Sequence, residues 1–490
     1  MLLLLNSLHH ILPFSQMAYP TQQDHKLIEQ TQIIPSSSTT TITSLPLTFL
    51  DLPLAGPIYV RRQFFYHFPH STNHFCKTTL PSLKHSLSLT LQHFFPLAGN
   101  LISPPPPHKP FILCTQKDSV TFTVIETLAN FNHLSANHHP KTLKDYNHLV
   151  PKLTHKTTYD DNDIENNTFI FPLLALQTSV FPNHGLCIAI TYCHLMDDSC
   201  CSHFMKSWSF IHRNCEAVDL KSTPCFDRKH FRDTKGLENV FLRDYFEERK
   251  TWKEKLIVQT QSQASEEEYV KATIVFAKEE IERMKIWALN QWKKNDHEVQ
   301  APQLLSKFVV TCGFIWASLI KTRYRNDDDD DKDDEKEEYF RFAGDCRERL
   351  GYKIPEGYFG NCLTLCHATV KRKDMKREDG FVNAVKVIER AISEMKNEPF
   401  KDVGEWRDTF KKMYLGSVLL VTGSPKFNVY ETDFGFGKAV KVEMVHSFKC
   451  MSIAESGDRE GGLEVGLVFK SGEFEYFCAV IEQGLEALKC

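Results

Sequence analysis

The sequence predicts a mixed α/β fold that is divided between two domains. The 490 residues far exceed the roughly 150 residues of a typical single domain. Segments with helical periodicity are interleaved with short apolar segments typical of strands, without a strict βαβ order. No repeat of roughly 20–50 residues is visible, so a solenoid or a propeller is not expected.

Several segments have the apolar periodicity of helices. Between Leu80 and Phe94 leucines recur at helical spacing, and Pro81 lies in a first turn, where proline is tolerated. Val385–Met395 has the same periodicity, and so does Phe474–Lys489 at the end of the chain. Each of these segments is therefore predicted to form an amphipathic helix.

Strands are predicted where short apolar runs follow turn residues. Val120–Ile125 alternates between apolar and polar side chains, and Leu186–Tyr192 is a compact apolar run. Near the C-terminus, Val440–Val445 and Leu463–Phe469 are expected to pair with each other.

The same patterns indicate the domain boundaries. We expect a poorly ordered N-terminal extension in residues 1–40. The residues before Met17 are expected to be an irregular addition to a chain that starts near Met17. An N-terminal domain is expected in residues 41–225, a crossover in 226–250 and a C-terminal domain in 251–490. Residues 326–338 are predicted to form an acidic loop inserted into the C-terminal domain.

Charge and composition narrow the class of protein. Residues 327–338 read DDDDDKDDEKEE and carry eight net negative charges, so the rest of the chain carries +4 although the whole carries −4. So small a positive charge does not indicate a nucleic-acid binder. No apolar run reaches the roughly 20 residues of a membrane helix. The 15 scattered cysteines favour reduced thiols in a cytoplasmic protein.

His194 is the strongest candidate for catalysis. It follows the predicted strand Leu186–Tyr192 directly, in the segment Cys193-His194-Leu195-Met196-Asp197-Asp198-Ser199. A histidine at a strand end can remove a proton from a hydroxyl group at neutral pH. Asp198 can orient the imidazole or stabilise the turn. For a motif this short, a hydrogen-bonded structural histidine is the alternative.

A second motif, Asp433-Phe434-Gly435-Phe436-Gly437, precedes the predicted strand Val440–Val445. Its glycines allow a tight backbone path against which the phenylalanines can pack. A phosphate-binding loop is excluded, because neither GxGxxG nor GxxxxGK[ST] occurs. A simple turn before the strand is the alternative.

A metal site and a serine hydrolase are not expected. Cys362, Cys366 and His367 have no second Cys or His pair at zinc-site spacing. On a strand, the two cysteines would share one face as small core residues. The Gly-x-Ser-x-Gly elbow of a serine nucleophile is also missing.

Together these motifs resemble the plant BAHD family of acyl-CoA-dependent acyltransferases. The resemblance extends from about Leu45 to the C-terminus and rests above all on the order and separation of His194–Asp198 and Asp433–Gly437. Further matches are Leu47-Thr48-Phe49-Leu50-Asp51, Phe95-Pro96-Leu97-Ala98-Gly99-Asn100 and Asp345-Cys346-Arg347. Two segments are similar to the subgroup that moves malonyl groups onto phenolic or flavonoid glucosides: Tyr358-Phe359-Gly360-Asn361-Cys362 and Val421-Thr422-Gly423-Ser424-Pro425-Lys426-Phe427.

The resemblance implies two similar domains of the chloramphenicol acetyltransferase type, joined by a long crossover, with a solvent channel between them. Acyl-CoA would enter from one face and the acceptor from the other. His194 would take the proton of the acceptor hydroxyl, which attacks the thioester carbonyl directly. The implied enzyme is a monomeric, cytoplasmic acyltransferase with malonyl-CoA as co-substrate, no permanently bound cofactor, and no nucleic-acid or membrane partner.

The resemblance also implies an ion pair between Asp198 and Arg347, which would fix the loop that carries His194. Asp433 stands beside His194 in the active-site signature. With Gly435 and Gly437, however, it would mainly hold the CoA side of the channel.

Four further residues are candidates for binding the donor. Thr422 and Ser424 would stabilise the tetrahedral oxyanion. Ser306 and Lys307, at the head of the apolar helix Phe308–Ile320, would line the CoA pocket.

The sequence departs from the family pattern at several positions, which leaves alternatives open. Ser199 stands where the family usually has glycine, Cys193 replaces a frequent histidine, and Phe436 replaces the motif tryptophan. The first basic residue after Asp198 is Lys206. Transfer of acetyl or hydroxycinnamoyl groups to an alcohol or amine is therefore an alternative to malonyl transfer. A non-catalytic member that binds a small molecule is a third hypothesis.

Overall fold

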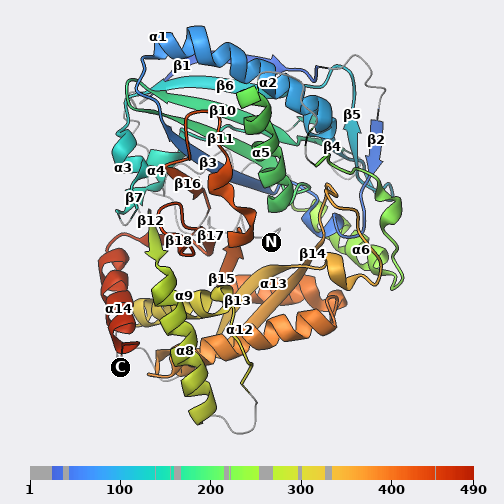
Figure 1. The fold of residues 1–490 in the computed structure, drawn as a ribbon. Helices are drawn as coiled ribbons and strands as arrows, with labels where there is room; N and C mark the ends of the chain where they lie inside the picture. Colours follow the sequence, from blue (N-terminus) through green and yellow to red (C-terminus); the bar gives the residue numbers. More distant parts are fainter. Residues whose placement is uncertain are drawn as a thin grey trace, which may run out of the picture.

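The protein folds into two bodies that lie one above the other (Figure 1). The computed structural model describes residues 25–36, 43–137, 139–154, 156–158, 167–214, 220, 222–252, 269–295, 301–325, 334–446 and 448–489. The expected start near Met17 lies outside these ranges. Within them, the strands form a six-stranded, a seven-stranded and a five-stranded sheet. None of the helices in these ranges is long and apolar enough to cross a membrane.

The elements agree with the predicted helices and strands. The strands are β1 His25–Ile33, β2 Thr43–Pro46, β3 Tyr59–His67, β4 Asn100–Ser103, β5 Phe111–Cys114, β6 Val120–Thr127, β7 Lys141–Thr142, β8 Lys156–Thr158, β9 Thr168–Pro172, β10 Leu174–Phe181, β11 Gly185–Cys193, β12 Tyr269–Phe276, β13 Glu337–Asp345, β14 Leu363–Lys371, β15 Ser417–Thr422, β16 Lys441–Met444, β17 Cys450–Glu455 and β18 Leu463–Lys470. The helices are α1 Thr72–His74, α2 Leu80–His93, α3 Phe131–Ser135, α4 Leu143–Asn147, α5 Asp198–Asn214, α6 Leu237–Arg249, α8 Lys278–Asn295, α9 Lys307–Arg323, α11 Arg372–Lys376, α12 Gly380–Asn397, α13 Trp406–Leu415 and α14 Glu473–Ala487.

The upper sheet has the order β1-β6-β10-β11-β3-β16, and its central strands β10 and β11 are buried on both faces. In β3, Phe64 and Tyr66 pack into the core that α2 and α5 cover, and Phe65 packs into the core beneath α3 and α4. Successive side chains of a strand point to opposite faces. Burial of both faces therefore explains why β11 is a nearly continuous apolar run.

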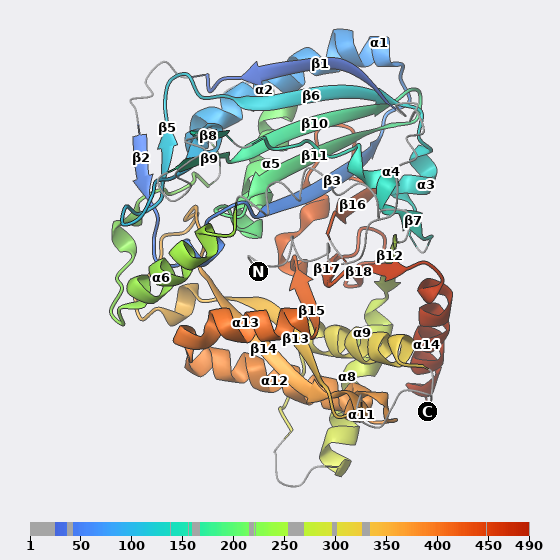
Figure 2. The same cartoon turned by 180° about the vertical axis from the view of Figure 1, so that it is seen from behind.

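The lower sheet has the order β14-β13-β15-β17-β18-β12-β7. Helices α8, α9, α12 and α14 contribute to the large core on one face, and Phe410 and Met413 of α13 pack on the other (Figure 2). Helix α9 is apolar almost all round because neighbours surround it, as the apolar segment Phe308–Ile320 predicts.

Each half of the chain lends a strand to the other body. Strand β16 pairs with β3 in the upper sheet, and β7 pairs with β12 in the lower sheet. The predicted pairing of Val440–Val445 with Leu463–Phe469 is therefore wrong, because β18 pairs with β12 and β17 instead. Alternation of apolar residues identifies a strand, but it carries no information about the partner.

Two predicted irregular segments are partly wrong. His25–Ile33 is not an extension but strand β1, at the edge of the upper sheet, where most of its side chains stay in contact with solvent and lack a clear apolar pattern. The acidic loop predicted to end at residue 338 ends earlier, because β13 begins at Glu337. Glu338 is buried in an ion pair with Arg372, at 2.7 Å. Residues 326–333 lie outside the described ranges.

The predicted crossover, residues 226–250, contains helix α6. Phe241 of α6 lies in one cluster with Phe49 of the first half of the chain and with Cys346 and Tyr358 of the second. The crossover therefore connects the two bodies by packing against both.

Candidate active site

His194 is the first residue after β11 and lies where the two bodies meet. Its backbone N–H donates to the carbonyl of Ile58 at 2.9 Å, and its carbonyl accepts from Nδ2 of Asn361 at 2.9 Å. The side chain is 7% exposed. Among the described residues, no hydrogen-bond partner reaches the buried Nδ1 atom of His194. The backbone is thus fixed from both bodies, and one ring nitrogen is left without a protein partner.

Asp197 fixes the start of α5 immediately after this loop. Its Oδ1 atom accepts from the Cys200 backbone N–H at 2.8 Å and from the Ser199 hydroxyl at 2.6 Å, as in a helix N-cap. Its Oδ2 atom lies 3.0 Å from Nη2 of Arg347. Burial by itself would raise the pKa of Asp197, but Arg347 and the hydrogen bonds from Ser199 and Cys200 together lower it. Asp197 is therefore an ionised link between α5 and the lower body.

Asp198 pairs with the upper body and also contacts the lower one. Its Oδ1 atom lies 3.6 Å from Nη2 of Arg62 in β3 and accepts from the Tyr192 hydroxyl, and its Oδ2 atom accepts from the Gly423 N–H at 3.2 Å. The predicted ion pair between Asp198 and Arg347 is wrong, because Asp197 takes Arg347. Adjacent residues at a helix start point about 100° apart, so the two aspartates face different arginines.

The two arginines differ in burial, and this leads to a prediction. In Asp198→Asn, Arg62 loses its partner while only 2% exposed, and we expect the free energy of unfolding to fall by about 3 kcal/mol. In Asp197→Asn the loss should be smaller, because Arg347 is 26% exposed and keeps Asp345 at 3.2 Å. Chemical denaturation measures both values. A larger loss for Asp197→Asn would contradict the assignment of partners.

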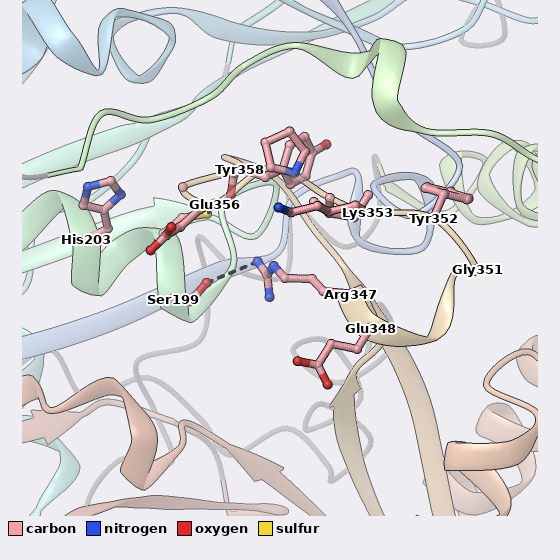
Figure 3. A pocket seen from close by; sticks show the side chains of 13 residues that line it. Ser199, His203, Arg347, Glu348, Gly351, Tyr352, Lys353, Glu356 and Tyr358 are labelled. Atoms are coloured by element: carbon pink, nitrogen blue, oxygen red, sulfur yellow. Dashed lines mark hydrogen bonds between the residues drawn. The ribbon is translucent and has the colours of Figure 1, made fainter.

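A pocket of about 970 Å³ opens beside the start of α5 (Figure 3). Helix α5 contributes Ser199, Cys200 and His203, and the opposite wall is formed by the segment from Arg347 to Tyr358. Its remaining lining residues are Glu348, Gly351, Tyr352, Lys353, Ile354, Pro355, Glu356 and Gly357. The lining combines aromatic, cationic and carboxylate side chains.

The cations of this pocket are not equivalent. Arg347 is balanced by Asp197 and Asp345, at 3.0 and 3.2 Å. Burial lowers the pKa of His203, which therefore stays neutral at pH 7. Within the described part of the chain Lys353 forms no ion pair, and its ammonium group points toward the start of α5 in Figure 3. Lys353 is thus the cation best placed to meet an anionic group of a ligand.

Asp433 lies far from this pocket. Its Oδ1 atom accepts from the N–H groups of Gly435 and Gly437 at 2.7 and 3.1 Å, and its Oδ2 atom pairs with Arg213 at 3.3 Å. Arg213 is in the last turn of α5, roughly 22 Å along the helix from Asp198. The placement of Asp433 beside His194 as a catalytic residue is therefore corrected to a structural role.

The rest of the second motif anchors α5. Gly435 and Gly437 have φ of 91° and 88°, which explains why glycine is needed at both positions. Phe434 packs edge-on against Trp208 at 4.8 Å between ring centroids. Phe436 contacts Tyr66 at 5.9 Å and so keeps the aromatic packing expected of the family tryptophan.

The predicted donor-binding residues fall in two places. Thr422 and Ser424 flank Gly423, whose N–H bonds to Asp198, so this segment lies against the His194 loop. Ser306 caps α9 by accepting from the Val309 N–H at 3.2 Å, and Lys307 donates to the Gly461 carbonyl at 2.8 Å. The roles of all four in binding the donor stay predictions.

Several residues that shape the site were not assigned a role from the sequence. Asp51 and Asn361 belong to segments that match the family, but nothing in their spacing connects them to His194. Arg62 lies in a polar stretch of β3, Arg61-Arg62-Gln63, so its burial could not be read from the sequence. Asp197 was not assigned a role, because the His-x-x-x-Asp spacing selects its neighbour Asp198.

Comparisons with known proteins agree with this fold. A family model described as "Transferase family" matches residues 26–483. The malonyl-coenzyme A:anthocyanin 3-O-glucoside-6''-O-malonyltransferase of Dahlia pinnata is 35% identical over 481 residues, 94% of this chain and 97% of the relative. The coumaroyl-CoA:anthocyanidin 3-O-glucoside-6''-O-coumaroyltransferase 1 of Arabidopsis thaliana is 33% identical, over 95% of this chain and 98% of the relative.

Among solved structures, vinorine synthase has the same fold. It matches with a TM-score of 0.62 and 18% identity, over 95% of this chain and 98% of the other. The two-body α/β architecture is thus shared with vinorine synthase. The chain belongs to the plant BAHD family of acyl-CoA-dependent acyltransferases.

Proposed function

We propose that this acyltransferase moves a malonyl group from malonyl-CoA to a sugar hydroxyl of a phenolic or flavonoid glucoside, with His194 as the general base. The observation that carries the proposal is the state of His194. Its backbone is held by both bodies, and its buried Nδ1 atom has no partner in the described residues. A buried polar atom without a partner is costly, so it is expected to serve a substrate.

The proposed reaction is a direct transfer. The imidazole of His194 accepts the proton of the sugar hydroxyl as the oxygen attacks the thioester carbonyl. The tetrahedral intermediate then breaks its carbon–sulfur bond, and the proton passes to the leaving thiolate of CoA. Thr422 and Ser424 are proposed as donors to the oxyanion, because their segment contacts the His194 loop through Gly423.

A glucoside acceptor is supported by both relatives, whose names each specify a 3-O-glucoside acylated at the 6'' position. The 970 Å³ pocket is large enough for such a molecule. Tyr352 and Pro355 offer faces for an aromatic ring, and the carboxylates of Glu348 and Glu356 can accept hydrogen bonds from sugar hydroxyls.

The relatives do not agree on the acyl donor, since one is named for malonyl-CoA and the other for coumaroyl-CoA. Lys353 favours malonyl-CoA, because the malonyl group carries a carboxylate that the coumaroyl and acetyl groups lack. An exposed ion pair of this kind contributes about 0.2–1 kcal/mol.

A donor panel tests the proposal. With an anthocyanidin 3-O-glucoside as acceptor, kcat/KM is expected to be highest for malonyl-CoA among malonyl-, acetyl- and coumaroyl-CoA. Lys353→Gln should lower the malonyl value about two- to fivefold and leave the acetyl value unchanged. Lys371→Gln, on the surface of the lower body, is the matched control. A preference for coumaroyl-CoA would show that the proposed donor, malonyl-CoA, is wrong. The absence of transfer with every donor and glucoside would favour a protein that binds a small molecule without catalysis.

The proposed location is the cytoplasm, and the proposed state is a monomer. The thirteen cysteines in the described residues are all free thiols, which suits a reducing compartment.

A further inference from the structure

Asn361 lies between His194 and a buried carboxylate from the beginning of the chain. Its Nδ2 atom donates to the carbonyl oxygen of His194 at 2.9 Å. Its backbone N–H donates to Oδ1 of Asp51 at 3.0 Å, and its Nδ2 atom lies 3.5 Å from the same oxygen. Asp51 is 1% exposed and Asn361 is 0% exposed.

Asp51 is itself held rigidly. Its Oδ2 atom accepts from the backbone N–H and from the hydroxyl of Thr48, both at 2.9 Å. The two carboxylate oxygens therefore bind different groups. Oδ2 closes the turn that contains Asp51, and Oδ1 holds Asn361. Hydrogen bonds to an ionised carboxylate are stronger than neutral ones. The position of Asn361 is thus set by the first half of the chain, although Asn361 belongs to the second.

This arrangement connects three segments that are distant in the sequence. Leu47–Asp51 supplies the carboxylate, Tyr358–Cys362 supplies the amide, and the loop after β11 supplies His194. The peptide groups on both sides of His194 are then bonded, one to Ile58 and the other to Asn361. With both peptide groups fixed, the direction of the bond from Cα to the imidazole is fixed as well.

We propose that Asn361 and Asp51 are a positioning pair that sets the imidazole of His194 for proton abstraction. The inference rests on the proposed role of His194 as the base. Neither residue exchanges a proton in the reaction. They act by holding the backbone of His194, and misplacing a reacting group by about 1 Å can reduce a rate about 100-fold. One buried atom on each linked residue, His194 Nδ1 and Asn361 Oδ1, has no hydrogen-bond partner among the described residues.

The test replaces the amide by an apolar side chain of similar shape. Asn361→Leu is expected to lower kcat about 100-fold and to change KM for the donor and acceptor less than threefold, because substrate contacts remain. Asp51→Ala should lower kcat about tenfold, and Asp51→Asn, which keeps an oxygen to accept from Asn361, should restore most of the loss. If Asn361 had only a structural role, its replacement would lower the fraction of folded protein. The kcat of the remaining folded enzyme would then stay unchanged.

Gln177 in β10 provides the matched control. It is also a buried amide, 5% exposed, and its Nε2 atom donates to a backbone carbonyl, that of His148, at 2.9 Å. Gln177→Leu is expected to lower the melting temperature and to keep kcat within twofold. An equal fall of kcat in both variants, or full kcat in Asn361→Leu, would overturn the inference.

Two outcomes separate this inference from the proposed function. If His194→Ala is inactive while Asn361→Leu has full kcat, only the positioning pair is wrong. If His194→Ala keeps full activity, the proposed base is wrong and the inference fails with it. Should Asn361→Leu not fold, the series Asp51→Asn and Asp51→Ala decides, since unchanged kcat in both would overturn the inference.

Discussion

His194→Ala is expected to abolish acyl transfer and to leave the fold intact. General-base catalysis contributes about 10² to 10⁴ in rate, so kcat should fall by at least 100-fold with every CoA thioester and glucoside. The fold should survive, because the Nδ1 atom of the side chain has no protein partner in the described residues and the backbone contacts to Ile58 and Asn361 remain. Steady-state kinetics and thermal unfolding of the same preparation measure both effects.

The control is a second buried histidine, which lies in α5, the helix that follows the His194 loop. His212 is 9% exposed and lies near the far end of α5, where it contacts Phe434. His212→Ala is expected to lower the melting temperature without lowering kcat of the folded enzyme. If His194→Ala retained the parental rate, the imidazole would not be the base.

Glu443→Gln is expected to destabilise the protein by about 3–5 kcal/mol, the largest stability effect that the structure predicts. Glu443 is 3% exposed and lies 2.9 Å from Nζ of Lys271 and 3.7 Å from Nζ of Lys441. Lys441 also pairs with Glu464, at 2.9 Å. These charges lie where β16 of the upper sheet meets β12 and β18 of the lower sheet. Neutralising Glu443 leaves the buried ammonium group of Lys271 without its carboxylate partner, while Lys441 keeps Glu464.

The same cluster predicts a loss of stability in acid. Burial by itself would raise the pKa of Glu443, but Lys271 and Lys441 lower it to about 2 from its ordinary value of 4.5. A carboxyl group with a lowered pKa in the folded state contributes stability above its unfolded pKa. That contribution, about 3 kcal/mol, is lost as the pH falls from 4.5 toward 2. Urea unfolding at pH 7 and pH 3 should show more than half of this loss in the parent and a smaller loss in Glu443→Gln.

Glu335 provides a matched control with the same pKa and no burial. Lys371 and Lys373 lower the pKa of Glu335 to about 2 by hydrogen bonds at the surface, where it is 52% exposed. Solvent screens such pairs, so Glu335→Gln should leave the unfolding transition nearly unchanged. Equal effects of the two substitutions would show that burial between the sheets is not the source of the stability.

The local structure of the chain was largely predictable. Leucine spacing in α2, the apolar periodicity of α12 and the apolar run of β11 each report which faces are buried, and burial follows from the side chains themselves. The loop after β11, with His194 at its start, was predictable because the apolar run of β11 ends there. Edge strand β1 was missed, because a strand with little burial has no apolar pattern to read.

The sequence by itself determined the family, the elements and the position of His194 in the chain. Only the tertiary structure decided which side chains meet. It gave Arg347 to Asp197 and Arg62 to Asp198, moved Asp433 to the far end of α5, exchanged β7 and β16 between the bodies, and brought Asp51 and Asn361 to His194. The physical reason is that burial depends on a residue's own chemistry and its near neighbours. An ion pair or a hydrogen bond depends on the direction of two side chains that the fold brings together from distant parts of the chain.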